Sequence, residues 1–206
     1  MISGDKNYNG VIDDLVNGSW ISPSDNKKYG IPIKNIEIRE TLDGREYDLI
    51  ESLHSNQKLL VVSDPFTHKA MGSRIFNNLK TKMNAEEYIW EQPSSSIEGV
   101  QFLRTKLKDY DGMIAVGSGT VSDSIKYATF LEDKVYSVFA TTPMNAYTTG
   151  TASISFDGIK KSLVAHYAQG VFFDLEVLSN CPKRLTAAAF ADVICRTTAQ
   201  VDWLMS

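Results

Sequence analysis

From residue 58 onward the chain alternates short, almost wholly apolar runs with longer segments whose apolar residues recur at helical spacing. Continuous apolar runs of this length are typical of strands that are buried on both faces of a sheet. We expect such strands at residues 59–62, 88–90, 113–116 and 135–139, and helices at 66–82, 96–108 and 121–131. Regular alternation of strand and helix predicts a parallel sheet with crossover helices, and therefore an α/β fold of Rossmann-like type.

The segments before and between these elements carry weaker signals. Residues 1–34 are rich in Gly, Asn, Ser, Asp and Lys and predict a lead-in with one short helix. Residues 31–38 alternate apolar and polar positions, which favours an edge strand, and residues 46–53 have the spacing of a helix. Ser95 and Glu98 have the spacing of a capping box, which predicts the start of the helix at 96–108.

The last quarter of the chain changes in character. Residues 152–156 and 162–164 predict a hairpin, residues 171–173 a buried strand, and residues 175–179 a short turn. Pro182 is suited to a first helical turn and opens a helix that runs to residue 206. This helix is apolar on all sides around Asp192 and Cys195, so we expect both residues to be buried. Because it reaches the last residue without a stop signal, the chain is interpreted as a portion of a longer one.

Composition narrows the classes of function. The chain has 43% hydrophobic and 22% charged residues, as an ordinary globular domain has. Its net charge of −4 and its dispersed Lys and Arg residues give no electrostatic basis for a nucleic-acid partner. No stretch approaches the roughly 20 apolar residues of a membrane span, and the polar first residues do not resemble a signal peptide. Together with only two cysteines, these features predict a cytoplasmic protein without a membrane span.

The first candidate site joins the strand at 113–116 to the helix that follows. It contains Gly117, Ser118, Gly119, Thr120 and Asp123. Glycines let the backbone approach a phosphate closely, and a helix start offers free N–H groups and the positive end of the helix dipole. The alternative is a glycine-rich turn in which Thr120 caps the helix. The segment is neither a G-x-G-x-x-G fingerprint nor a Walker sequence, so both interpretations stay open.

Two aspartates are the next candidates. Asp64 ends the strand at 59–62, where a carboxylate can accept hydrogen bonds from an adenine ribose, although a plain helix cap before Pro65 is the more common role. Asp192 stands among apolar residues, where an isolated carboxylate is costly unless it is paired or bound to a cation. A metal ligand and a salt bridge to Arg196 or Arg184 are equally compatible with its position.

Several segments together form a wider pattern: Gly18-Ser19-Trp20, residues 61–65, GSGTVSDSIKYA at 117–128, PMNAYT at 143–148, DGIK at 157–160, residues 174–185, AFAD at 189–192 and Asp202-Trp203-Leu204. In this order they resemble the glycerol-1-phosphate dehydrogenase family, within the group that includes glycerol dehydrogenases, iron-containing alcohol dehydrogenases and dehydroquinate synthase. The resemblance covers nearly the whole chain. Each segment is a weak signal alone, and the combination is specific.

The resemblance implies an NAD(P)-binding α/β domain at residues 1–178, followed at 179–206 by the first helix of a truncated, all-helical metal-binding domain. It also implies a divalent metal, with zinc expected, held by one Asp and two His. Asp192 matches that Asp, and the two His have no counterpart in this sequence. The cofactor-binding residues that it implies are Asp64, Gly117, Ser118, Gly119, Thr120, Asp123, Thr141 and Thr142.

The implied reaction moves a hydride between NAD(P)H and a phosphorylated triose, which interconverts dihydroxyacetone phosphate and sn-glycerol 1-phosphate. Lys160 and Asn145 are the implied catalytic residues, Lys160 near the nicotinamide or the substrate phosphate. Asn145 stands where the family usually has Asp, and Ala146 and Ala191 replace glycines. Another polyol dehydrogenase of the group, or a non-catalytic nucleotide-binding module, are the alternatives. A homo-oligomer is compatible with all of them.

Overall fold

The computed structural model describes residues 8–205. Its helices are α1 (Tyr8–Val16), α2 (Glu46–His54), α3 (Pro65–Thr67), α4 (Ser73–Leu79), α5 (Ile97–Leu107), α6 (Gly119–Leu131), α7 (Leu175–Ser179) and α8 (Lys183–Met205). Between them lie a π-helical turn, η1 (His68–Gly72), and a 3-10 turn, η2 (Asn145–Thr148). The strands are β1 (Trp20–Ile21), β2 (Lys28–Tyr29), β3 (Asn35–Arg39), β4 (Leu59–Ser63), β5 (Ala85–Ile89), β6 (Gly112–Gly117), β7 (Val135–Ala140), β8 (Thr151–Phe156), β9 (Ile159–Val164) and β10 (Gly170–Asp174).

Six strands form one parallel sheet in the order β3-β10-β7-β6-β4-β5. This confirms the α/β class and the edge position predicted for the strand near residues 31–38. After β4 the chain turns outward to β5 and then crosses back to β6 on the other side of β4. The sheet therefore has a topological switch point between β4 and β6, and ligands of open α/β sheets bind at the carboxyl ends of strands at such a point.

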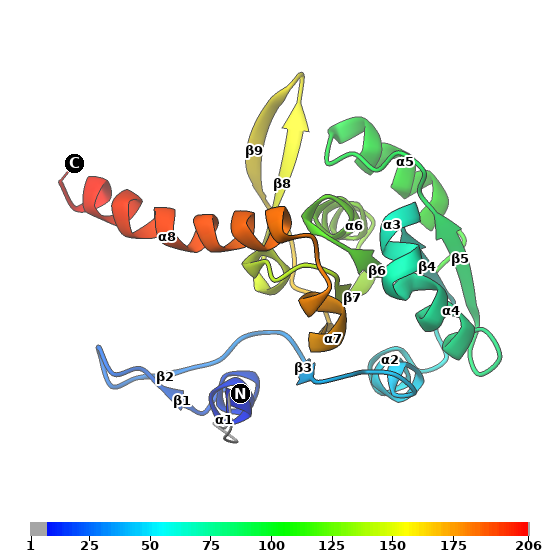
Figure 1. The fold of residues 1–206 in the computed structure, drawn as a ribbon, viewed down its shortest axis with the longest axis horizontal. Helices are drawn as coiled ribbons and strands as arrows, with labels where there is room; N and C mark the ends of the chain where they lie inside the picture. Colours follow the sequence, from blue (N-terminus) through cyan, green and yellow to red (C-terminus); the bar gives the residue numbers. More distant parts are fainter. Residues whose placement is uncertain (1–7, 206) are drawn as a thin grey trace.

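The sheet is covered on both faces. Alternate residues of β4 point to opposite sides, as the geometry of a strand requires. Leu60 and Val62 pack in a core with α5 and α6, whereas Leu59 and Val61 pack in a second core with α2 and α4. Figure 1 shows these helices on the two sides of the sheet. Burial on both faces explains why the central strands β4 and β6 are almost free of polar residues.

Several predicted boundaries were wrong by a few residues. Helix α5 is capped by Ser96, whose side chain accepts a hydrogen bond from the N–H of Gly99, so the capping box predicted for Ser95 and Glu98 does not form. Strand β5 spans Ala85–Ile89 rather than residues 88–90, and α6 begins two residues before the expected start at 121. The helix expected at 66–82 is divided into α3, the π turn and α4.

Helix α8 projects away from the rest of the domain (Figure 1). The expected burial of Asp192 and Cys195 was wrong, because the Asp192 side chain is 49% exposed and Cys195 is exposed too. An apolar pattern on all sides indicates that a helix is covered by other elements, but it does not identify those elements. Within residues 8–205, no helix is both long and apolar enough to cross a membrane.

Candidate functional site

A cavity of about 690 Å³ lies at the carboxyl ends of the parallel strands. Its walls come from the loops after β3, β4, β5, β6 and β7 and from the segment that joins α7 to α8. Four residues that the sequence predicted as cofactor ligands line it, and they come from three different loops: Asp64, Ser118, Thr141 and Thr142. The topology thus brings together, at the switch point, side chains that lie as many as 78 positions apart in the sequence.

Asp64 has the helix-cap role that its sequence position allowed. Its Oδ1 accepts hydrogen bonds from the N–H groups of Phe66 at 2.8 Å and Thr67 at 2.9 Å, and the hydroxyl of Thr67 accepts one from the N–H of Asp64 at 3.0 Å. This reciprocal capping box starts α3. The cap uses Oδ1 and leaves Oδ2 out, in a residue that lines the cavity. A helix cap and a second ligand can therefore share one carboxylate.

The start of α6 provides the anion-binding features. Ser118 is the N-cap residue, and its side chain makes no capping hydrogen bond to the helix. The 13-residue helix behind it directs the positive end of its dipole and its first N–H groups toward the cavity edge. A Cβ built on Gly119 would meet only the flexible end of Met144, at 3.4 Å or more. The fold therefore does not require glycine there, which leaves ligand approach as a reason for it.

Gly117 has a different explanation. A Cβ at this position would lie 2.7 Å from the Cβ of Val121, closer than real side chains come. Gly117 is therefore needed for the packing of α6 against β6. Its carbonyl accepts a hydrogen bond from the hydroxyl of Tyr147 at 2.9 Å, and that hydroxyl is 2.8 Å from the Oγ1 of Thr142. Thr142 thus has a structural partner.

Thr141 is the clearest sign that the cavity takes a polar ligand. The residue is 7% exposed, and its Oγ1 is buried without a hydrogen-bond partner among the described residues. A buried hydroxyl without a partner costs about 1–3 kcal/mol. Thr141 lines the same cavity as Ser118 at the start of α6. A diphosphate placed between them would accept hydrogen bonds from both hydroxyls and from the helix N–H groups, so the residues present fit a dinucleotide.

Asp123 and Lys126 lie below this surface, on the buried side of α6. One Asp123 oxygen accepts a hydrogen bond from Ser153 N–H at 3.1 Å, and the other is 3.5 Å from Lys126 Nζ. Lys126, 0% exposed, also donates to the carbonyls of Ala146 at 2.7 Å and Thr151 at 2.9 Å. Burial raises the pKa of Asp123 and lowers that of Lys126, and each charge opposes the shift of the other. The pair ties η2 and β8 to α6 and does not line the cavity.

The two predicted catalytic residues also lie outside the cavity lining. Asn145 begins η2, where its carbonyl accepts a hydrogen bond from the hydroxyl of Thr148. Lys160 is exposed on β9, in the β8–β9 hairpin, opposite Ser155. Gly117, Gly119, Thr120 and Asp123 are likewise not among the residues that line the cavity.

Sequence reasoning missed an ionic network at the base of the cavity. Arg74 lines the cavity and pairs with the buried carboxylates of Glu46 and Asp174, each at 2.7 Å. Burial works against the charge of Arg74, but Asp174 and Glu46 raise its pKa overall. Likewise, burial opposes the ionisation of Asp174, while the Leu42 N–H and Arg74 lower its pKa overall. The only sequence signal was a charged residue in an apolar helical pattern, which does not identify partners 28 and 100 positions away.

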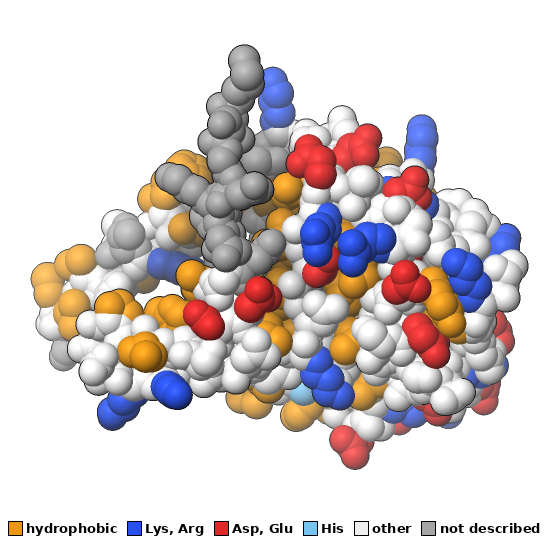
Figure 2. Space-filling view, turned by 90° about the horizontal axis from the view of Figure 1, so that it is seen from below, with side chains coloured by type: hydrophobic (Ala, Val, Ile, Leu, Met, Phe, Trp, Pro, Cys, Tyr) orange, Lys and Arg blue, Asp and Glu red, His pale blue; other side chains and the backbone are white. Residues whose placement is uncertain are grey.

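Charge around the cavity is mainly negative. Its lining includes four carboxylates, from Asp43, Asp64, Glu91 and Glu176, and the guanidinium of Arg74, which two other carboxylates already neutralise. On the face shown in Figure 2, by contrast, acidic and basic side chains are interspersed. The negative charge of the cavity lining therefore contrasts with the mixed charge of this face.

The described residues do not form a metal centre by themselves. Asp192 lies 3.6 Å from Arg196 one helical turn away, which is the salt bridge that the sequence offered as an alternative. Within residues 8–205, no group of three or more His, Cys, Asp or Glu side chains is arranged to hold a metal ion. A catalytic zinc site commonly needs three protein ligands, so the carboxylate of Asp192 does not hold such an ion without further ligands.

Comparison with known proteins agrees with this geometry. The chain is 29% identical over 161 residues to "Glycerol-1-phosphate dehydrogenase [NAD(P)+]" of Bacillus subtilis (strain 168), covering 74% of this chain and 41% of that protein. It is 30% identical over 162 residues to the protein of the same name from Pyrococcus horikoshii, covering 77% and 46%. The chain therefore spans less than half the length of these relatives.

Solved structures show the same fold. Glycerol dehydrogenase of Schizosaccharomyces pombe aligns with a TM-score of 0.66 at 19% identity, over 74% of this chain and 40% of that one. NADH-dependent butanol dehydrogenase A of Thermotoga maritima aligns with a TM-score of 0.67 at 17% identity, over 80% and 48%. The family profile described as "Iron-containing alcohol dehydrogenase" matches residues 37–182, which is well over half of the sequence. The chain belongs to the iron-containing alcohol dehydrogenase family.

Proposed function

We propose that the protein is an NAD(P)- and metal-dependent dehydrogenase that interconverts dihydroxyacetone phosphate and sn-glycerol 1-phosphate. Residues 1–178 form its nucleotide-binding domain, and residues 179–206 begin its metal-binding domain. The observation that carries the proposal is the cavity at the switch point, where an unpartnered Thr141 hydroxyl, the start of α6 and Asp64 converge. The proposed substrate is supported by the relatives, which are named glycerol-1-phosphate dehydrogenases.

In this proposal the residues of the chain bind and orient the dinucleotide. The hydroxyls of Ser118 and Thr141 and the first N–H groups of α6 hold the diphosphate. Oδ2 of Asp64 accepts a hydrogen bond from a hydroxyl of the adenine ribose. The bound nicotinamide supplies or accepts the hydride. Gly119 has no side chain, so the diphosphate can approach the backbone closely there, whereas Gly117 allows α6 to pack against β6.

The acidic lining favours NAD over NADP. A 2′-phosphate would be placed beside the carboxylate of Asp64, and close like charges in a cavity repel each other strongly. Asp43, Glu91 and Glu176 add negative charge to the same cavity, and the one guanidinium there is already paired. We therefore expect NAD to bind at least as well as NADP.

The remaining site residues are proposed on the family resemblance alone. Asp192 is one of three ligands of a divalent metal, zinc in our proposal, and its half-exposed carboxylate holds no ion unaided. Asn145 and Lys160 contact the substrate or the nicotinamide. Asp123 supports the cofactor site indirectly, through the segment that it and Lys126 hold in place.

The test is an assay of the full-length protein with dihydroxyacetone phosphate and NADH, and of the reverse reaction with the two enantiomers of glycerol phosphate. Oxidation of the sn-1 enantiomer alone is expected. A protein that binds NAD but turns over neither substrate would contradict the proposed reaction, and faster turnover of an unphosphorylated polyol would assign it to a different member of the group.

Cofactor binding is tested separately by calorimetry on Gly119→Val. A Cβ at this position meets only the flexible end of Met144. We therefore expect the fold to persist in this variant, and its melting temperature checks this. Loss of NAD binding is expected because the isopropyl group blocks approach of the diphosphate. Unchanged affinity for NAD would show that the start of α6 does not bind the cofactor.

A further inference from the structure

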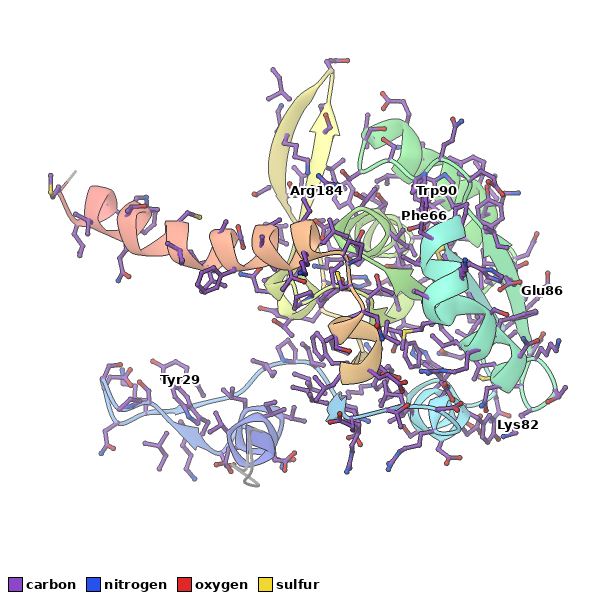
Figure 3. All side chains as sticks on the ribbon, viewed as in Figure 1. Tyr29, Phe66, Lys82, Glu86, Trp90 and Arg184 are labelled. Carbon is purple, nitrogen blue, oxygen red and sulfur yellow. The ribbon has the colours of Figure 1, made fainter. Side chains whose placement is uncertain are left out.

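A large aromatic side chain stands on the rim of the cavity. Phe66 is 85% exposed, yet it belongs to the residues that line the cavity. Figure 3 labels it at the end of the sheet where α3 begins. Its ring is therefore an apolar surface that faces both the solvent and the cavity.

The ring is held by a rigid backbone. Pro65, the residue before Phe66, stands in the first helical turn and has its own φ locked by its ring. The N–H of Phe66 donates a hydrogen bond to Asp64 Oδ1 at 2.8 Å. The capping box with Thr67 closes the same turn. Little backbone entropy remains to be lost when a ligand packs on the ring, so a flat group that fits there binds at low cost.

The neighbouring groups indicate which flat group it is. Asp64, whose Oδ2 we assign to the adenine ribose, is only two residues from Phe66 and is bonded to its N–H. In a nucleoside the base is attached directly to the ribose, so a ribose on Asp64 brings its base within reach of the ring of Phe66. Pro65, Ala70 and Pro93 give the cavity further apolar surface.

We propose that Phe66 stacks on the adenine of the bound dinucleotide and is an affinity-determining residue of the cofactor site. The inference rests on the proposed binding of NAD. A base stacked on an aromatic side chain is a sequence-independent contact whose removal weakens nucleotide binding about tenfold or more. The contact concerns the adenosine half of the cofactor and leaves the nicotinamide half unaffected.

Calorimetry on the full-length protein tests this with three ligands: NAD, ADP-ribose, which keeps the adenosine, and nicotinamide mononucleotide, which lacks it. The variants are Phe66→Trp, Phe66→Leu and Phe66→Ala. The matched control is Ile159→Ala, which removes an exposed apolar side chain outside the cavity lining. For NAD and ADP-ribose we expect Trp to bind as well as Phe, Leu more weakly, and Ala about tenfold more weakly. Mononucleotide binding and the control should not change.

Each outcome distinguishes the two proposals. If wild type binds neither NAD nor ADP-ribose, the proposed cofactor is wrong and the stacking assignment falls with it. If wild type binds NAD but Phe66→Ala stays within twofold of it, only the stacking assignment is overturned. An equal loss for the mononucleotide would also overturn it, because it would show that the substitution disturbs the site as a whole.

Discussion

Removal of the charged end of Lys126 should destabilise the protein far more than a typical surface substitution. Lys126→Met keeps a flexible chain of similar length and deletes the ammonium group. The side chain is fully buried, and its Nζ donates to the carbonyls of Ala146 and Thr151 and lies 3.5 Å from the carboxylate of Asp123. The substitution removes one hydrogen bond from each carbonyl, although both still accept one from the hydroxyl of Thr149. It also leaves the carboxylate of Asp123 without its countercharge.

The magnitude follows from these lost partners. Each lost hydrogen bond costs about 0.5–1.5 kcal/mol, and breaking a buried ion pair from one side costs about 3–5 kcal/mol. Because the groups share one donor, the terms overlap, and we expect a loss of about 4 kcal/mol in the free energy of unfolding. Asp123→Asn should cost less, since an amide oxygen can still accept the N–H of Ser153. In the double variant no charge is stranded, so its cost should be smaller than the sum of the two single costs.

Urea unfolding of the four proteins, followed by circular dichroism, gives these free energies. Hydrogen exchange at residues 145–151 should increase in Lys126→Met beyond the change elsewhere, because the ammonium group holds this segment. A cost below about 1 kcal/mol would show that Lys126 makes no net contribution in its buried position. Strict additivity of the single costs would refute the coupling between Asp123 and Lys126.

Three other predictions concern the cofactor, pH and metal. Asp64→Asn should raise the affinity for NADP relative to that for NAD, with little change in melting temperature, because Asn also caps helices. An unchanged ratio of the two affinities in calorimetry would show that Asp64 does not bind the ribose. Burial lowers the pKa of His54, so the folded protein resists a proton that the unfolded chain accepts, and unfolding free energy should fall as pH drops below about 6.5. His54→Gln should flatten this slope in urea titrations at several pH values, and an equal slope would exclude His54 as its source. Asp192→Asn should lower the metal content and turnover of the full-length protein without changing its affinity for NAD, whereas Arg196→Met should retain the metal. Equal metal content in the two variants would show that Asp192 is only a salt-bridge partner of Arg196.

The sheet could be predicted from the sequence because its strands are buried on both faces. The runs at 59–62, 113–116 and 135–139 have almost no polar residue, and each became a strand with boundaries within one residue. Strand β5 was placed less well, since its burial pattern is intermediate and its first residues include two glutamates. Hydrophobic pattern therefore locates central strands better than edge strands.

The candidate site was predictable only in part. Asp64 and Ser118 follow buried strands directly, so the rule for open parallel sheets brings them to one edge. The partners of Arg74 and Lys126 depend on long-range contacts that spacing along the chain does not reveal. The burial of Asp192 was overestimated because the apolar pattern of a helix shows which of its faces are hydrophobic but not which elements cover them.

The π-helical turn at His68–Gly72 has a consequence for comparing this chain with its relatives. A π turn holds one more residue than an α turn, and each residue advances a helix by about 100°. Deleting one residue between 68 and 72 would rotate α4 relative to α3. The guanidinium of Arg74 would then no longer contact both Glu46 and Asp174. A relative with an uninterrupted helix should thus align with a one-residue gap here, and the position equivalent to Arg74 is found by superposing structures rather than by counting from the aspartate at the end of β4.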